Sequence, residues 1–367
     1  MQVCEGKMIF DDVLEIKNGR NQKNVENPNG KYPIYGSGGI MGYADDYICE
    51  ADTVIIGRKG SINNPIYVEE PFWNVDTAFG LSAKRKILMP RYLYYFCQYF
   101  DFERLNKAVT IPSLTKSDLL KIELELPTIE TQKKMVDRLI KVEQIIQLKK
   151  RELQKLDILV KSRFAEMFGD PIMNPKGWKV VTIGDIVTEV RYGTSKPAVE
   201  GGKYPYLRMN NLTADGHLDL NDLKYIDISD DEVEKCVVRK GDVLFNRTNS
   251  IDLVGKTAVF DLPDDMVIAG YIIRVRLNEK ILPEVLSQYM NLEALKDILR
   301  SMAKGAVNQA NINAQELQSI RVYVPDIELQ KQFVEMKDQV DKLKSKIQKS
   351  LEKTQLLFDS LMQKYFG

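Results

Sequence analysis

The 367-residue chain has few residues of the kinds that carry redox, metal or hydrolytic chemistry. Its four cysteines are scattered without C-x-x-C spacing, so neither a metal cluster nor a disulfide framework is supported. They are Cys4, Cys49, Cys97 and Cys236. We therefore expect reduced thiols, no metal site and no bound cofactor.

Recognisable catalytic motifs are also missing. The only histidine, His217, gives Ser-His or Cys-His catalysis at most one candidate. The fragment VGKT at 254–257 resembles the end of a phosphate-binding loop, but Ser250 stands where that loop needs glycine. GSGG at 36–39 fails the dinucleotide-binding pattern because Met41 takes the place of the third glycine. We therefore predict a non-catalytic protein.

No apolar run approaches the ~18 residues that cross a bilayer. The first residues, MQVCEGKMIFDD, contain neither the basic nor the apolar region of a secretion signal. These absences predict a cytoplasmic protein without membrane contact. With 44% hydrophobic residues, the chain is long enough for two domains that each bury a core.

An excess of charge of either sign is lacking too, since 52 basic residues balance 52 acidic ones. Binding to a polyanion usually draws on clustered Lys and Arg. Only residues 128–169 are basic, with ten Lys and Arg against six Asp and Glu. Any contact with nucleic acid must therefore come from local patches on the larger blocks, or a partner must supply much of the phosphate binding.

The chain does contain an internal repeat with a register of 198 residues. ELPTIETQKK at 125–134 recurs as YVPDIELQKQ at 323–332, and MFG at 167–169 recurs as YFG at 365–367, without a gap. Upstream the repeat is fainter and needs gaps: ADTVIIGRKGS at 51–61 corresponds to GDVLFNRTNS at 241–250. The blocks before the shared segments have therefore diverged more than the segments themselves. Two binding domains of different specificity on a common scaffold would give this pattern, and so would two ordinary duplicated domains.

Each of the two repeated segments predicts a long helix. Apolar residues from Leu139 to Met167 follow a 3-4 spacing, which lays a stripe along one helical face, and Lys149 and Arg163 interrupt it. At ~1.5 Å per residue such a helix spans roughly 60 Å, too long for the interior of a small domain. We expect the two helices to pair with each other, although a coiled coil that merely dimerises would show the same pattern.

The blocks before the helices mix both kinds of secondary structure. Five β-branched or apolar stretches predict strands, namely 51–57, 122–126, 241–246, 270–277 and 319–324. Residues 90–106 and 283–300 predict helices that proline opens. We therefore predict an α+β fold: two mixed α/β domains, related by the repeat and joined by two long helices that pair as an antiparallel coiled coil.

The two-fold repeat and the P-x-I-E-x-Q-K start of each long helix resemble the specificity subunits of type I restriction-modification systems. The string FGDPIMNPKGWKVVTIGDI at 168–186 looks like the junction into that family's second recognition domain. The resemblance covers essentially the whole chain, but the first block begins without the Gly-Trp that precedes the second. It implies target-recognition domains at 1–128 and 170–325, with spacer helices at 129–169 and 326–367.

The resemblance also implies a DNA-reading subunit whose two domains each recognise one half of a bipartite double-stranded site. In that family two modification subunits, which carry S-adenosylmethionine, methylate adenine, and restriction subunits with motor and nuclease activity complete the complex. The competing interpretation is an adaptor or scaffold protein that binds no DNA and uses its helices as a dimerisation seam.

Candidate DNA contacts are polar loop positions, since Arg pairs with guanine and Asn or Gln with adenine in the major groove. In the first domain they are Tyr35, Gly36, Arg58, Lys59, Ser61, Asn63, Asn64, Trp73, Asn74, Lys107, Thr110 and Ser113. In the second they are Arg208, Asn210, Asn211, Arg247, Thr248, Asn249, Ser250, Lys304, Asn308, Gln309 and Asn311. Arg247 and Arg58, which occupy matching positions in the repeat, are predicted to contact a base or a phosphate.

Overall fold

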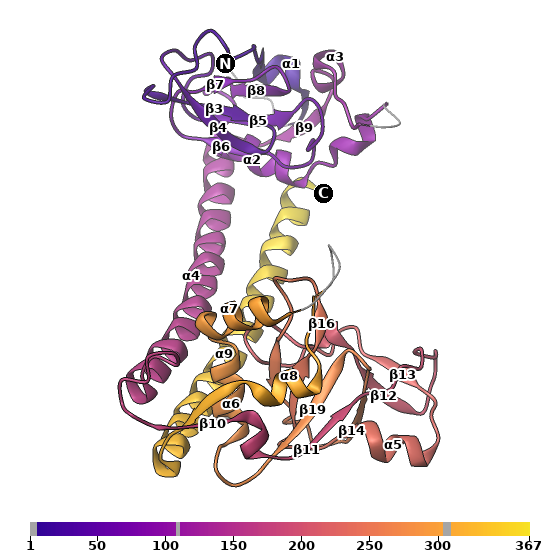
Figure 1. Ribbon diagram of the computed structural model, residues 1–367. Helices are drawn as coiled ribbons and strands as arrows, with labels where there is room; N and C mark the ends of the chain where they lie inside the picture. Colours follow the sequence, from indigo (N-terminus) through magenta and orange to yellow (C-terminus); the bar gives the residue numbers. More distant parts are fainter. Residues whose placement is uncertain (1–5, 108–110, 304–309) are drawn as a thin grey trace. The chain divides into compact units, whose positions relative to one another are not determined.

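The computed structural model describes residues 6–107, 111–303 and 310–367. They form two compact units: unit 1 contains the chain up to Lys150 together with Gln348–Gly367, and unit 2 contains Arg151–Ile347. The division falls within two forty-residue helices, α4 (Ile129–Phe168) and α9 (Ile327–Phe366), so each unit includes a segment of both (Figure 1). Both long helices predicted from the sequence are therefore present.

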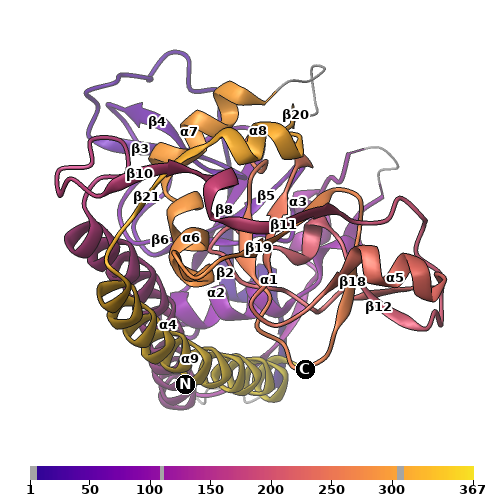
Figure 2. The same cartoon turned by 60° about the horizontal axis from the view of Figure 1, so that its bottom comes forward.

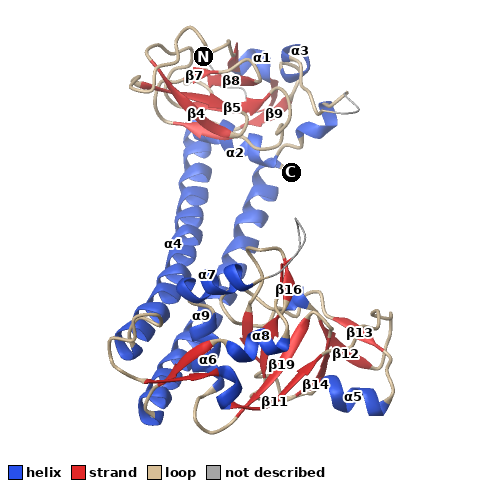
Figure 3. Cartoon of the chain, viewed as in Figure 1, coloured by secondary structure: helices blue, strands red, loops and turns tan. Residues whose placement is uncertain are grey.

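Unit 1 mixes strands with short helices, as Figure 3 shows by colour. Before α4 its elements are β1 (Gly6–Ile9), α1 (Phe10–Val13), β2 (Leu14–Asn18), β3 (Tyr32–Gly36), β4 (Gly39–Ala44), β5 (Thr53–Gly57), β6 (Ile66–Val68), β7 (Trp73–Asn74), β8 (Ala78–Ala83), α2 (Pro90–Tyr99), the 3-10 helix η1 (Phe102–Leu105), α3 (Lys116–Leu119) and β9 (Glu123–Leu126). The strands form sheets in the orders β2-β8-β5-β6, β4-β3-β7 and β1-β9.

Unit 2 repeats this plan with additions. Its elements outside the long helices are β10 (Lys179–Thr182), η2 (Ile183–Ile186), β11 (Val187–Tyr192), β12 (Tyr204–Leu207), η3 (Met209–Asn211), β13 (Lys224–Ile226), α5 (Asp230–Cys236), β14 (Val237–Val238), β15 (Val243–Asn246), β16 (Thr248–Asn249), β17 (Thr257–Val259), β18 (Met266–Ile268), β19 (Ile272–Leu277), α6 (Pro283–Met290), α7 (Glu293–Met302), β20 (Ala310–Asn311), α8 (Ala314–Ser319) and β21 (Arg321–Val324). The sheet orders are β11-β19-β15-β17, β13-β12-β18-β14, β10-β21 and β16-β20.

The two units share one topology. The sheet β2-β8-β5-β6 corresponds to β11-β19-β15-β17, β4-β3-β7 corresponds to β13-β12-β18, and β1-β9 corresponds to β10-β21. In each unit the second of these sheets contains one parallel pair, β3 with β7 or β12 with β18, among otherwise antiparallel pairs. Unit 2 adds β14 and α5. The repeat therefore extends through the blocks whose sequences have diverged.

The helices α4 and α9 pair antiparallel in each unit. In unit 1, Arg138 Nη1 donates to the Tyr365 hydroxyl at 3.4 Å, and Lys149 Nζ donates to Ser350 Oγ at 2.8 Å. In unit 2 the rings of Phe164 and Phe333 meet at 5.2 Å. Residue numbers on α4 rise as those on α9 fall, and the two helices lie next to each other in Figure 2. Lys149, which interrupts the apolar stripe, thus finds a polar partner on the facing helix.

Each unit buries its own core on the helix pair. In unit 1, Val136 and Leu139 of α4 and Met362 and Tyr365 of α9 join a cluster that includes the β-strands and α2. In unit 2, Val160, Phe164 and Phe168 of α4 with Phe333 and Val340 of α9 join the corresponding cluster. The apolar stripe predicted on the helices is therefore the face that packs inward.

The predicted strands and helix starts are confirmed, but both predicted helices are shorter than expected. Pro90 and Pro283 begin α2 and α6, where proline lacks only an N–H that has no partner within the helix. The helix after Pro283 is interrupted at Asn291, so that α6 and α7 are separate. The Asn291 side chain there donates from Nδ2 to Thr257 O at 2.6 Å. Among the described helices, none combines the length and the apolar run that crossing a membrane needs.

Candidate nucleic-acid interface

A buried glutamine fixes the start of α4 to the sheets and short helices of unit 1. Gln132 is fully buried, and its Nε2 donates to Ile87 O and Pro127 O, both at 2.8 Å. Its Oε1 accepts from Met89 N at 2.8 Å, the residue that precedes α2. One side chain therefore fastens the first turn of α4 to the loop that opens α2.

The same arrangement recurs in unit 2 with Gln330. Its Nε2 donates to Lys280 O at 3.0 Å and Pro325 O at 2.9 Å, and its Oε1 accepts from Leu282 N at 2.8 Å. Gln330 is also fully buried. The Gln of the repeated P-x-I-E-x-Q-K segment thus fastens the helix start to the preceding fold in each unit.

In unit 1, Arg58 follows β5 and is held by its backbone on both sides. Its N–H donates to Thr77 O at 2.7 Å, and its carbonyl accepts from Leu114 N at 2.9 Å. The side chain is exposed, lies 5.8 Å from the centre of the Phe79 ring and has no carboxylate partner among the described residues.

Arg247 occupies the equivalent position after β15 in unit 2. Its N–H donates to Tyr271 O at 3.0 Å, and its carbonyl accepts from Ile312 N at 2.9 Å, which is 198 residues beyond Leu114. The guanidinium lies 4.9 Å from the centre of the Tyr192 ring. Within the part of the chain that is described, it too lacks a carboxylate partner. The two arginines predicted to match therefore share backbone geometry as well as freedom from internal ion pairs.

Arg247 lines a cleft of about 560 Å³ in unit 2. The lining residues are Thr194, Ser195, Lys196, Pro197, Ala198, Tyr206, Arg208, Met209, Asn210, Arg247, Ala269, Gly270 and Tyr271. Three predicted residues, Arg208, Asn210 and Arg247, are thus brought together. Burial raises the pKa of Tyr206 to about 12, so its hydroxyl stays protonated and donates to Thr194 O and Lys196 O.

The predicted residues around Arg208 differ in their freedom to bind. Arg208 Nη2 donates to Asp222 Oδ2 at 2.6 Å, and hydrogen bonds from Lys224 and Arg208 lower the pKa of that carboxyl. Asn210 is exposed. Asn211 is buried: its Oδ1 accepts from Arg208 N and its Nδ2 donates to Asp219 O, both at 2.8 Å. Asn211 closes a turn and is not available for DNA.

The next predicted group of unit 2 surrounds the β16-β20 pair. Thr248 is buried, and its hydroxyl donates to Asn311 Oδ1 at 3.1 Å, so both side chains serve the pairing of the two strands. Asn249 Nδ2 donates to Asn246 Oδ1, whereas Ser250 is exposed. The candidates Lys304, Asn308 and Gln309 lie outside the described residues.

Among the predicted residues of unit 1, two neighbours of Arg58 are accessible. Lys59 and Ser61 are exposed, and Lys59 pairs through its backbone with Ser113, which is half-buried. Lys107 forms an ion pair with Asp118 at 2.9 Å. Thr110 lies outside the described residues.

Four further candidates of unit 1 have side chains that serve the fold or, at Gly36, no side chain. Trp73 is buried and donates to Arg20 O at 3.0 Å, Asn74 is fully buried and donates to Ala78 O, and Gly36 is buried beneath Met41. Asn63 binds Asp101 and the backbone of η1.

Two other predicted positions of unit 1 are accessible only in part or face a different hollow. Tyr35 is half-buried against Phe72, with ring centres 5.4 Å apart. Asn64 is exposed but lines a hollow with Tyr99 and Phe358, beside the helix pair of unit 1. Neither position adjoins Arg58 through a described contact.

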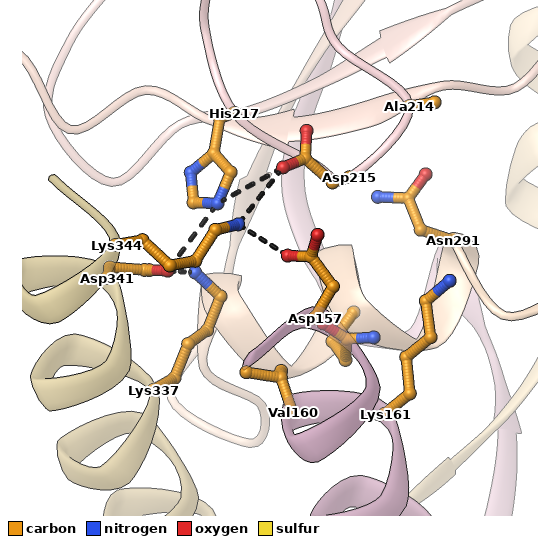
Figure 4. Close-up of a pocket in the computed structure, with 11 residues that line it drawn as sticks. Asp157, Val160, Lys161, Ala214, Asp215, His217, Asn291, Lys337, Asp341 and Lys344 are labelled. Carbon is orange, nitrogen blue, oxygen red and sulfur yellow. Dashed lines mark hydrogen bonds and ion pairs between the residues drawn. The ribbon is translucent and has the colours of Figure 1, made fainter. Parts of the chain in front are cut away.

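His217 lies in a cluster of charged side chains within unit 2, where the loop 213–217 meets α4 and α9 (Figure 4). Lys344 Nζ contacts Asp157 Oδ1 at 2.6 Å and Asp215 Oδ2 at 3.3 Å. His217 Nε2 lies 3.5 Å from Asp341 Oδ1. Opposite charges face each other across the cavity, so the cluster fastens the loop to the helices.

Sequence reasoning missed Tyr271, Tyr192 and Lys196, which lie at or beside the cleft. The sequence does contain one signal beside Tyr192: a glycine directly follows each of the equivalent strands β2 and β11. A Cβ at Gly19 would lie 1.8 Å from Val75 O, and one at Gly193 would lie 2.1 Å from Ile268 O. Only glycine permits this close approach of two chain segments.

The comparisons with known proteins identify the family. The description Type I restriction modification DNA specificity domain matches residues 7–157 and 175–354. The chain belongs to this family. The printed description names DNA specificity, which is the role that the resemblance of the sequence implied.

Several members of the specificity family are similar over large parts of the chain. It is 30% identical over 196 residues to the putative type I restriction enzyme MjaX specificity subunit of Methanocaldococcus jannaschii, which covers 52% of this chain and 46% of that protein. It is 23% identical over 335 residues to the EcoKI specificity subunit of Escherichia coli K12, with coverage of 84% and 72%. The aligned part thus spans about half the length of the archaeal relative.

Solved structures of the specificity family share the fold. The type I S subunit from M. genitalium matches with a TM-score of 0.64 and 17% identity, covering 100% of this chain and 97% of that one. A chain from a study of complex assembly and conformational transition of the type I R-M system matches with a TM-score of 0.58 and 18% identity, covering 98% and 97%.

Proposed function

We propose that this chain recognises a bipartite target in double-stranded DNA, with one half of the site read by each recognition domain. The observation that carries the proposal is the pair Arg58 and Arg247, two arginines without carboxylate partners at equivalent positions in a member of the DNA-specificity family. The recognition domains would be residues 1–128 and 170–325. The spacers at 129–169 and 326–367 would form an antiparallel coiled coil.

The DNA contacts that accessibility supports are fewer than the sequence alone predicts. They are Arg58, Lys59, Ser61, Arg208, Asn210, Arg247, Asn249 and Ser250, with Thr110, Lys304, Asn308 and Gln309 as further candidates. Arginine and asparagine can each form paired hydrogen bonds with a base edge, whereas lysine and serine contact phosphates as readily.

We further propose that two modification subunits bind the helices, one in each unit. Large apolar side chains stay exposed on both helices, and three pairs of them recur at the repeat distance: Ile145 and Leu343, Ile158 and Leu356, and Leu159 and Leu357. Unit 1 contains one member of each pair and unit 2 contains the other. A surface that is present twice suits one kind of partner bound twice.

Catalysis in the assembly would belong to these partners. The modification subunits would methylate the site, and restriction subunits with motor and nuclease activity would cleave unmodified DNA. The same proposal places the chain in the cytoplasm, where DNA is accessible to it.

The test is a gel-shift series with the chain, its modification subunits and duplexes that contain the site found by methylome sequencing. Arg58→Ala and Arg247→Ala should each relax one position in a different half of the site, at a cost of ~1 to 3 kcal/mol for a base contact. A phosphate contact would instead weaken binding to all sequences alike.

Arg300→Ala is the matched control, because Arg300 is paired with Glu293 and Asp297 in unit 2. It should leave sequence preference unchanged. If Arg58→Ala and Arg247→Ala bind every duplex as the unsubstituted chain does, the two arginines do not contact DNA. If the assembled complex shows no sequence-dependent shift at all, the chain is an adaptor.

A further inference from the structure

Two arginines of the unit 2 cleft contain hydrogen-bond donors that have no acceptor. The Nε atoms of Arg208 and Arg247 are buried, and neither has a partner among the described residues. Both side chains line the same cleft of about 560 Å³. Arg58, the equivalent of Arg247 in unit 1, is exposed, so this situation is particular to unit 2.

A buried N–H without an acceptor destabilises the folded state, and a ligand that supplies the acceptor is one explanation for such a group at a cleft. The remaining contacts of Arg247 are weak: its Nη1 donates to Gly270 O at 3.4 Å, and its guanidinium lies near the Tyr192 ring. Arg208 is held at one nitrogen only, through Asp222. Neither guanidinium has all of its N–H groups bonded within the protein. Each can therefore turn toward an acceptor in the cleft at the loss of few hydrogen bonds.

The walls of the cleft favour a flat organic group over a bare anion. Tyr206 is fixed by its two hydroxyl bonds, and Tyr271 is 50% exposed at the opening. Pro197 and Met209 add apolar surface. The one amine, Lys196, is paired with Glu232 at 2.5 Å. Aromatic and apolar walls with a few donors are typical of sites that stack a nucleobase.

We propose that the unit 2 cleft receives one unstacked guanine nucleotide of the target DNA. The O6 and N7 atoms of guanine are a pair of acceptors that arginine recognises, and a base must leave the helical stack to enter a cleft. Arg208 and Arg247 bind that acceptor edge, and Tyr271 stacks on the ring. The proposal rests on the proposed DNA recognition and names the base that unit 2 reads.

The experiment uses the full chain assembled with its modification subunits. Each guanine in the half-site read by unit 2 is replaced in turn by 7-deazaguanine, which lacks the N7 acceptor. One replacement should lower affinity about tenfold, and the same replacements in the other half-site should change affinity less than threefold. Arg247→Lys, which keeps the charge but loses the paired donors, should abolish the difference between guanine and 7-deazaguanine at that position.

A second measurement detects the unstacking. 2-Aminopurine placed beside the sensitive guanine should become several times brighter on binding, and Arg208→Met and Arg247→Met should suppress the increase. Unchanged near-ultraviolet circular dichroism of the variants separates this result from misfolding.

The outcomes distinguish the cleft from DNA recognition as such. If 7-deazaguanine weakens binding but 2-aminopurine stays quenched, the base is read within the groove and the cleft proposal is wrong. If no guanine is sensitive while Arg247→Met weakens all sequences equally, the cleft binds a backbone phosphate and the proposal is also wrong. A complex without any sequence preference overturns the proposed function itself.

Discussion

At the scale of single residues, Gln132 and Gln330 have the clearest structural role. Each satisfies two carbonyls and one amide N–H of the backbone that no water reaches, because the glutamine is fully buried. The sequence marks both residues as repeated but gives no reason for the repetition. The geometry provides it, since only an amide side chain offers a donor and an acceptor at this distance from the helix.

We expect Gln330→Leu to lower the free energy of unfolding of unit 2 by about 3 kcal/mol, because Leu282 N, Lys280 O and Pro325 O lose their partner. Urea unfolding followed by Trp178 fluorescence in a Trp73→Phe background measures the change. Gln332→Leu makes the same chemical change at an exposed site on α9 and should cost less than about 0.5 kcal/mol. Equal effects of the two substitutions would contradict the role assigned to Gln330.

Individual site residues were the least predictable from the sequence. Asn in a loop either caps the backbone or faces solvent, and both roles select the same residue. Asn74 and Asn211 turned out to be buried caps, while Asn210 is exposed. Arg58 and Arg247 could be matched in advance because the strands before them carry recognisable apolar runs.

At the scale of elements, most starts and stops follow from proline and glycine. Pro90 and Pro283 open helices, and Gly169 ends α4 with φ of +84°, its N–H donating to Ala165 O at 2.8 Å. What the sequence could not provide was the break at Asn291, since that depends on a hydrogen bond to a distant strand.

Gly169→Ala should destabilise unit 2 by about 2 kcal/mol, through the left-handed backbone and through a Cβ that would lie 2.9 Å from Pro175 Cγ. Gly177→Ala is the matched control, because Gly177 has φ of +68° with open space around it. It should cost only about 1 kcal/mol. Thermal unfolding of both variants tests the difference, and a larger effect at Gly177 would rule out the contribution of the Pro175 contact.

The charged cluster that joins the loop 213–217 to the helices predicts a dependence on pH. Burial opposes ionisation of Asp215, but the Thr213 hydroxyl, His217 and Lys344 outweigh it and hold its pKa below the ordinary 3.8. Because the folded-state pKa is lowered, this carboxylate stabilises unit 2 above about pH 4, and the contribution is lost as the pH falls through the folded-state value.

Asp215→Asn should therefore cost about 1 kcal/mol at neutral pH, the scale of a partly exposed ion pair. The difference from the unsubstituted chain should shrink steadily below pH 4. Urea titrations at several pH values measure it, with Asp264→Asn at an exposed turn as the control. A difference that stays constant down to pH 3 would show that the Asp215 charge does not contribute.

At the scale of the whole molecule, duplication is the property that the sequence conveyed best. The register of 198 residues was clear in the segments that form the long helices and their buried glutamines. It was faint in the blocks that contain the loops. The shared topology extends it to every sheet of unit 1. The extra α5 and β14 of unit 2 could not be foreseen, because short polar helices leave no strong periodic pattern.

The repeated apolar positions predict two partner sites. Leu343→Ser, Ile158→Ser and Leu159→Ser together remove the exposed patch of unit 2 and should leave a complex with one modification subunit instead of two. Light scattering of the purified complex gives the stoichiometry. Lys342→Ser with Lys346→Ser is the control, since these exposed lysines lie on the same helix. Retention of two partners would mean that they bind elsewhere.

The last twenty residues of the chain complete the core of the unit that contains the first 150. A ribosome therefore starts unit 1 early and supplies Met362 and Tyr365 only after all of unit 2 has been made. Unit 2, whose residues are contiguous, can fold before then. A nonsense mutation just after Ile347 would consequently leave unit 2 complete. Unit 1 would lack the α9 residues that cover its core, although most of it is made first.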